Sequence, residues 1–270
     1  MGRPADKQRA IEQARVARVR LGVGLDAPVP DILRLIEDVA EIPVTVLDLP
    51  EGVAGAIGHK KGRHFIFINS ADQPVRRRFT LAHEFGHHEL GHEPVVDRRE
   101  DIYEGSGKRR PEEVEANYFA SEFLAPEQAV RLFAQARRIE TVDLDAVVRL
   151  ADFFGVSAQA ARIRFEQVGL LPKKRDRDRL DGQIKAEEHV PLIRAASLDG
   201  PTDSLSREKI DFRERRIPES AFRRIAHAYS RGLARVDRLA SQVGTTSSEL
   251  ERQLAAAGVE APRLEDDDKD

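Results

Sequence analysis

The chain has 270 residues, of which 40% are hydrophobic and 34% are charged, with a formal net charge of −3. This length allows one main hydrophobic core and a smaller appended segment, and the near balance of charge gives no overall attraction to nucleic acid. The absence of cysteine excludes disulfides and thiolate metal sites, and there is no apolar run of the roughly 20 residues that a membrane helix needs. With no secretory segment at the N-terminus, these features favour a cytoplasmic protein that does not act at a membrane.

The N-terminal part is expected to alternate helices with short strands. Residues 4–20 are rich in Arg, Lys, Gln and Ala and predict a surface helix whose basic face is solvated. Residues 31–40 carry an apolar stripe and predict a second helix, which precedes a short strand at 44–47. Three spaced glycines between 52 and 58 indicate a loop or an irregular strand, and residues 64–69 alternate with the two-residue period of a strand.

Residues 74–90 predict one long, partly buried helix, which Pro74 can begin because its missing N–H is not needed in the first turn. Near its middle lies H-E-F-G-H, formed by His83, Glu84 and His87. Histidines four residues apart lie on one helix face and can bind a single zinc ion. The glutamate beside the first histidine can act as a general base toward water at the metal. The pattern predicts the core of a zinc-dependent peptidase.

A second H-E-x-x-H pattern follows at once, with His88 and His92 as its histidines. Five residues of helix turn this pair by roughly 140° from the first, so the two pairs cannot serve one metal ion. The second pair spans a glycine and approaches a proline, where the helix is expected to end. We therefore assign the metal to the first pair and expect His88 and His92 to lie at a solvated helix end.

A third protein ligand is needed, because catalytic zinc usually has three of them and an open position for water. Residues 112–124 predict another core helix, and the carboxylates of its first turn, Glu112 and Glu113, are expected to serve the helix dipole. Glu115 lies at the edge of the apolar stripe and is the expected ligand. Glu122, seven residues further on, is interpreted either as a partner that orients a histidine ligand or as a plain surface carboxylate.

Three segments of the chain resemble the ImmA/IrrE family of metallopeptidases, and with the helices that follow they cover about residues 28–172. The segments are F-I-F-I-N at 65–69, F-T-L-A-H-E-F-G-H at 79–87 and E-A-N-Y-F-A at 115–120, the last followed by Leu124 and Pro126. The resemblance implies an α+β, mainly helical fold, with a minimal zincin-like domain, a small sheet and helix-turn-helix-like segments after it. As in other zinc peptidases, the strand at 64–69 is expected to pair with the substrate backbone.

The same resemblance implies a metal site and a task. The metal ligands would be His83, His87 and Glu115, and Glu84 would be the catalytic base. The expected metal is Zn²⁺, with Mn²⁺ as the alternative. The implied activity is an endopeptidase that cleaves a helix-turn-helix repressor at one site and so derepresses stress-response or mobile-element genes. The alternative is a non-proteolytic, zinc-containing regulator that sequesters a repressor or binds DNA.

Much of the rest of the chain, from residue 144 onward, is expected to be helical. Residues 144–165 predict a helix-turn-helix-like unit with Ser157 as the N-cap of its second helix. Only Arg162 and Arg164 are basic in that second helix, which favours packing or repressor docking over direct DNA binding. Residues 173–188 alternate in charge and indicate a linker or a solvated helix.

The expected organisation therefore has six parts. They are an N-terminal helical arm at 1–27, a zincin-like metallopeptidase domain at 28–135, a helix-turn-helix-like segment at 136–172, a charged linker at 173–210, a C-terminal helical segment at 211–262 and an acidic disordered tail at 263–270. The C-terminal segment is expected to contact a repressor or a second copy of the chain.

Overall fold

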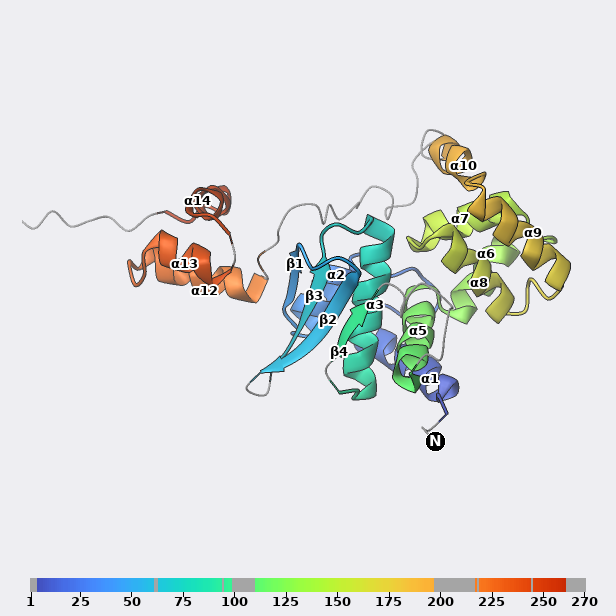
Figure 1. The fold of residues 1–270 in the computed structure, drawn as a ribbon, viewed down its shortest axis with the longest axis horizontal. Helices are drawn as coiled ribbons and strands as arrows, with labels where there is room; N and C mark the ends of the chain where they lie inside the picture. The colour runs from blue at the N-terminus through green and yellow to red at the C-terminus, as the bar shows by residue number, and fades with distance from the viewer. Residues whose placement is uncertain are drawn as a thin grey trace, which may run out of the picture.

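The computed structural model describes residues 4–60, 63–93, 95–98, 110–196, 217, 219–243 and 245–260. The strands are β1 (Val44–Leu47), β2 (Val53–Lys60), β3 (Arg63–Asn69) and β4 (Val95–Arg98). The helices are α1 (Lys7–Arg20), α2 (Ile32–Arg34), the π-helix η1 (Leu35–Val39), α3 (Pro74–Leu90), α5 (Pro111–Leu124), α6 (Glu127–Ala136), α7 (Leu144–Phe154), α8 (Ala158–Gln167), α9 (Lys174–Lys185), α10 (His189–Ala196), α12 (Glu219–Ser230), α13 (Val236–Gln242) and α14 (Ser247–Ala256). The expected α+β, mainly helical fold is confirmed (Figure 1).

The strands form one mixed sheet with the order β1-β3-β2-β4, against which α3 packs. β1 runs parallel to β3, whereas β2 is antiparallel to both β3 and β4. The expectation that the strand at 64–69 pairs with a substrate backbone is wrong for residues 66–68, because β1 and β2 occupy both edges of β3 there. The glycine-containing segment before it is a strand of eight residues, in which Gly58 leaves room for the ring of Phe65.

Helix α1 packs into the main core instead of lying on it as a surface arm. Ala10, Ala14 and Ala17 are fully buried in the same hydrophobic cluster as the sheet, α3 and α5. Arg18 is also buried, and its guanidinium donates hydrogen bonds to the carbonyl oxygens of Gly24, Ala27 and Phe123. Burial lowers the pKa of Arg18 to about 10, and the three carbonyls accept one hydrogen bond from each of its three nitrogens. The helix at 4–20 is thus confirmed, while its basic face is only partly solvated.

The helix-turn-helix-like unit forms as expected from α7 and α8. Ser157 caps α8 by accepting a hydrogen bond from the backbone N–H of Ala160. Both basic residues of α8 are held inside the protein: Arg162 pairs with Asp181 and Arg164 pairs with Glu122. Guanidinium groups held in this way do not present a basic surface to a DNA groove, which agrees with a packing role.

The C-terminal helices form a second hydrophobic cluster, separate from the main one. The buried members of this cluster are Ile217, Ile225, Leu239, Ala240, Leu250 and Leu254. The first part of the expected linker forms α9 and α10, while its part at 197–210 and the expected acidic tail at 263–270 lie outside the described residues. Within the described parts of the chain, no helix has both the length and the apolar character needed to cross a membrane.

Glu122 is neither a partner of a histidine ligand nor a surface carboxylate. Its buried side chain accepts a hydrogen bond from Arg15 of α1 at 2.8 Å and another from Arg164 of α8. The buried carboxylate therefore joins three helices in one ion-pair network, in which the partly exposed Arg15 and the buried Arg164 compensate its charge.

Replacing Glu122 by Ala should lower the free energy of unfolding by about 3–5 kcal/mol, because Arg164 would stay buried without its carboxylate. Urea denaturation measures the change. The control is Glu127→Ala, which removes a half-exposed carboxylate and should cost about 1 kcal/mol or less. A loss of under about 1 kcal/mol in Glu122→Ala would contradict the assigned role.

Candidate metal centre

Helix α3 presents the first H-E-x-x-H pattern to the protein interior. His83, Glu84 and His87 are fully buried, on a helix that Pro74 begins and Gly91 ends. Gly91 has a φ of 66°, in the left-handed region that favours glycine, so α3 ends at the residue before it, Leu90. The helix expected at 74–90 is confirmed with both of its ends.

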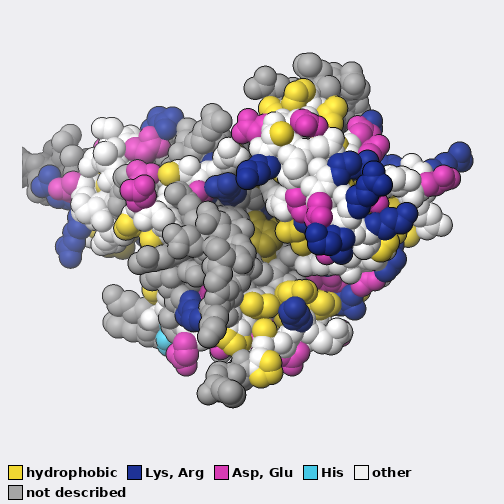
Figure 2. Space-filling view, turned by 45° about the vertical axis from the view of Figure 1, so that its right-hand side comes forward, with side chains coloured by type: hydrophobic (Ala, Val, Ile, Leu, Met, Phe, Trp, Pro, Cys, Tyr) yellow, Lys and Arg dark blue, Asp and Glu magenta, His cyan; other side chains and the backbone are white. Residues whose placement is uncertain are grey.

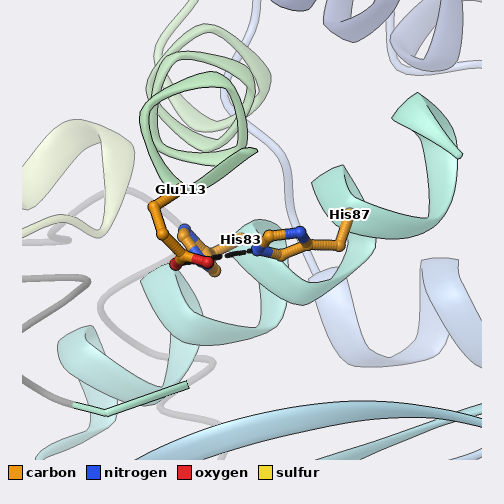
Figure 3. A group of neighbouring side chains, drawn as sticks. All are labelled: His83, His87 and Glu113. Carbon is orange, nitrogen blue, oxygen red and sulfur yellow. Dashed lines mark hydrogen bonds and ion pairs between the residues drawn. The ribbon is translucent and has the colours of Figure 1, made fainter. Parts of the chain in front are cut away.

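Three ligand atoms converge between α3 and α5 (Figure 3). The Nε2 atoms of His83 and His87 lie 3.0 Å apart, and Glu113 Oε2 lies 3.4 Å from the first and 3.9 Å from the second. A tetrahedral zinc ion with bonds of about 2.0–2.1 Å separates its ligand atoms by about 3.3 Å. These separations fit one zinc ion, and the described part of the chain holds one such group of side chains.

Glu113, and not Glu115, faces the two histidines. Two residues of helix turn a side chain by about 200°, so the two carboxylates leave α5 in nearly opposite directions. Glu115 is buried toward α1, where it accepts a hydrogen bond from the backbone N–H of Asp6 at 2.7 Å. Arg110 contacts the other oxygen of Glu113 at 2.5 Å. The first-turn carboxylate that we expected to serve the helix dipole is therefore the one that can complete a metal site.

Two observations show that the three side chains suit a cation. Oε2 of Glu113 is buried and receives no hydrogen bond from any residue that the structure describes. The Nδ1 atom of His83 lies 3.2 Å from the side-chain oxygen of Asn117, which makes Nδ1 the donor and leaves the Nε2 lone pair available to a metal. Glu113 and Asn117 are four residues apart on one face of α5, and this spacing is the sequence signal that could have identified Glu113.

The carboxylate of Glu84 lies against β2 at a position where the strand has no side chain. A Cβ atom added to Gly55 would lie 2.6 Å from Glu84 Oε1 and 2.6 Å from Thr80 Cγ2, which is closer than atoms can approach. The glycine therefore provides the space in which the Glu84 carboxylate sits. This geometry explains one of the glycines that made β2 look irregular in the sequence.

His88 and His92, the second histidine pair, differ in burial and in the residues that they contact. The side chain of His88 is 27% exposed, and burial lowers its pKa while the charge of Glu89 opposes that effect. The side chain of His92 is only 4% exposed and contacts His87. The expectation of a solvated helix end is wrong for His92, because Gly91 turns the chain back over the end of α3.

Comparisons with known proteins agree with this centre. Residues 37–166 match the family model described as the IrrE N-terminal-like domain of the M78 peptidases. The chain is 42% identical to the radiation response metalloprotease IrrE of Deinococcus radiodurans over 66 residues, which cover 24% of this chain and 20% of that protein. It is 30% identical to the protein of the same name from Deinococcus deserti over 122 residues, which cover 45% and 42% of the two chains.

The fold and the buried motif helix define a zincin-like domain of the metallopeptidase type. Residues 37–166 match the IrrE N-terminal-like domain, so this part of the chain resembles the ImmA/IrrE metallopeptidases. The chain spans less than half the length of the curated relatives that it matches.

Metal content distinguishes the two glutamates of α5. Glu113→Ala should weaken zinc binding by more than about 100-fold, as should His83→Ala and His87→Ala, because each change removes a converging ligand atom. Glu115→Ala keeps all three ligand atoms and should retain zinc in a weaker site. Elemental analysis after dialysis against a dilute chelator measures this difference. Zinc retained by Glu113→Ala and lost from Glu115→Ala would reverse the assignment.

Proposed function

We propose that this chain is a zinc-dependent endopeptidase that cleaves a helix-turn-helix transcriptional repressor at one site. The observation that carries this proposal is the convergence of His83, His87 and Glu113 on one point, on a helix whose Glu84 is also buried. Two relatives are named radiation response metalloproteases, which supports a metalloprotease that acts in a stress response. Cleavage would derepress stress-response or mobile-element genes, and the cytoplasm is the proposed location.

The residues divide the chemistry between them. His83, His87 and Glu113 would hold a zinc ion, which would supply Lewis-acid polarisation of the scissile carbonyl and lower the pKa of bound water. Glu84 takes the proton of the attacking water and passes it to the leaving amine. Asn117 holds the ring of His83 so that Nε2 faces the metal position. Zinc is favoured over manganese because two imidazoles and one carboxylate are ligands that it commonly takes.

Each part of the chain is proposed to have its own role in cleavage. The zincin-like domain at 28–135 would carry the peptidase site, and the segment at 136–172 would dock the repressor. The C-terminal segment at 211–262 has its own hydrophobic cluster and is proposed as a further surface for that partner.

Direct DNA binding is the less favoured function for the helix-turn-helix-like segment. On the face drawn in Figure 2, basic side chains gather over the helices at the right, and acidic side chains lie around and between them. Arg162 and Arg164, the basic residues of α8, are buried in ion pairs with Asp181 and Glu122 and so contribute little to this surface. DNA binding requires several basic side chains that face one groove or backbone.

Glu84→Gln should leave zinc stoichiometry unchanged and lower the cleavage rate by about 10²- to 10⁴-fold, because the amide cannot accept the proton of water. The assay follows a purified helix-turn-helix repressor on a gel, with and without a chelator. The matched control is Glu89→Gln in the second H-E-x-x-H pattern, which should cleave like the wild type.

Two outcomes would contradict the peptidase assignment. One is cleavage by Glu84→Gln at the wild-type rate. The other is a repressor that stays intact in a stable complex with wild-type protein, which would indicate sequestration without proteolysis.

Gly55→Ala should slow cleavage while the protein keeps its zinc, because the added methyl group must displace Glu84 or Thr80. A displacement of about 1 Å at a catalytic group can cost about 10²-fold in rate. Single-turnover rates and zinc content measure the two effects. Gly182→Ala adds the same methyl group where no atom lies within 4 Å and should change neither. Equal rates for Gly55→Ala and wild type would show that Glu84 needs no such space.

A further inference from the structure

A series of buried polar contacts begins at His87, on the side of its ring opposite to the metal position. The Nδ1 atoms of His87 and His92 lie 2.9 Å apart, and His92 Nε2 lies 3.0 Å from Glu115 Oε2. The other oxygen of Glu115 accepts the backbone N–H of Asp6, the residue that caps α1. The contacts thus connect a candidate ligand on α3 with α5 and with the start of α1.

The end of helix α3 places His92 for this contact. With Gly91 in the left-handed conformation, the backbone N–H of His92 donates to the carbonyl of His87 at 3.0 Å, and that of Gly91 donates to the carbonyl of His88 at 3.1 Å. These two bonds form the Schellman arrangement that ends many helices. The reversal brings the ring of His92 back over His87, with 4.9 Å between the ring centroids.

One assignment of protons gives a donor and an acceptor to each of these contacts, from His87 through His92 and Glu115 to Asp6. If Nε2 of His87 faces the metal, its proton is on Nδ1 and is donated to Nδ1 of His92. His92 then carries its own proton on Nε2 and donates it to the carboxylate of Glu115. The amide of Asp6 donates to the remaining oxygen of Glu115. No acceptor faces another acceptor, and each imidazole is neutral.

We propose that His92 and Glu115 are positioning residues for the metal ligand His87, and that α1 helps to hold them. This inference rests on the proposed metal centre. Partners that accept the second ring proton of a ligating histidine fix its orientation and make it a stronger ligand. Here a second imidazole transmits the charge of Glu115 to His87, whereas His83 is held by the neutral amide of Asn117. The residues before the matched region 37–166 would thereby contribute to the metal centre.

The test measures zinc affinity by competition with a chromophoric chelator in the full chain. His92→Phe keeps an aromatic ring but removes both polar contacts, and it should weaken zinc binding by about 10- to 100-fold. His92→Gln supplies an acceptor and a donor at a spacing similar to that of the ring nitrogens, and it should recover most of that loss. His88→Phe, on the neighbouring histidine, should bind zinc like the wild type.

The results separate the two levels of the proposal. The positioning role would be overturned if His92→Phe bound zinc as tightly as the wild type while the separate variant His87→Ala had lost the metal. The metal centre itself would then still stand. Zinc affinity unchanged in His87→Ala would overturn both. If His92→Phe fails to fold, ¹⁵N resonances of the zinc-loaded wild type decide, because His92 must carry its proton on Nε2. A proton on Nδ1 of His92 would overturn the role.

Discussion

The close contact between α3 and α5 determines where the metal centre can form. His83 and His87 share one face of α3, but a third ligand reaches them only if another helix approaches closely. Gly86 permits that approach, since a Cβ atom there would lie 2.9 Å from the ring of Phe119 on α5. Phe85 packs edge-on against the same ring, with 5.8 Å between the centroids. The glycine inside H-E-F-G-H therefore serves helix packing, and the packing brings Glu113 to the histidines.

Much of the fold could be predicted from local sequence because local interactions determine it. Pro74 and Gly91 begin and end α3, and the hydroxyl of Ser157 caps α8. The apolar stripes identified the helices, and the two-residue period identified β3. β2 was harder to recognise, because its glycines are there for the close approach of Glu84 and Phe65, which only the folded chain reveals.

The third ligand could not be fixed in this way, because it depends on how α5 is rotated about its axis. An apolar stripe defines the buried side of a helix only broadly, and a shift of two residues moves a carboxylate to nearly the opposite face. Both Glu113 and Glu115 are buried, one toward the candidate metal position and the other toward α1. Nor does the sequence show that His92 turns inward, since that follows from a left-handed residue and its helix-ending hydrogen bonds.

Diffraction from zinc-soaked crystals on either side of the zinc absorption edge tests the central claim most directly. Three protein atoms should surround a single anomalous peak at about 2.0–2.2 Å: Nε2 of His83, Nε2 of His87 and one oxygen of Glu113. A peak bonded to Glu115 in place of Glu113, or no peak between α3 and α5, would contradict the account.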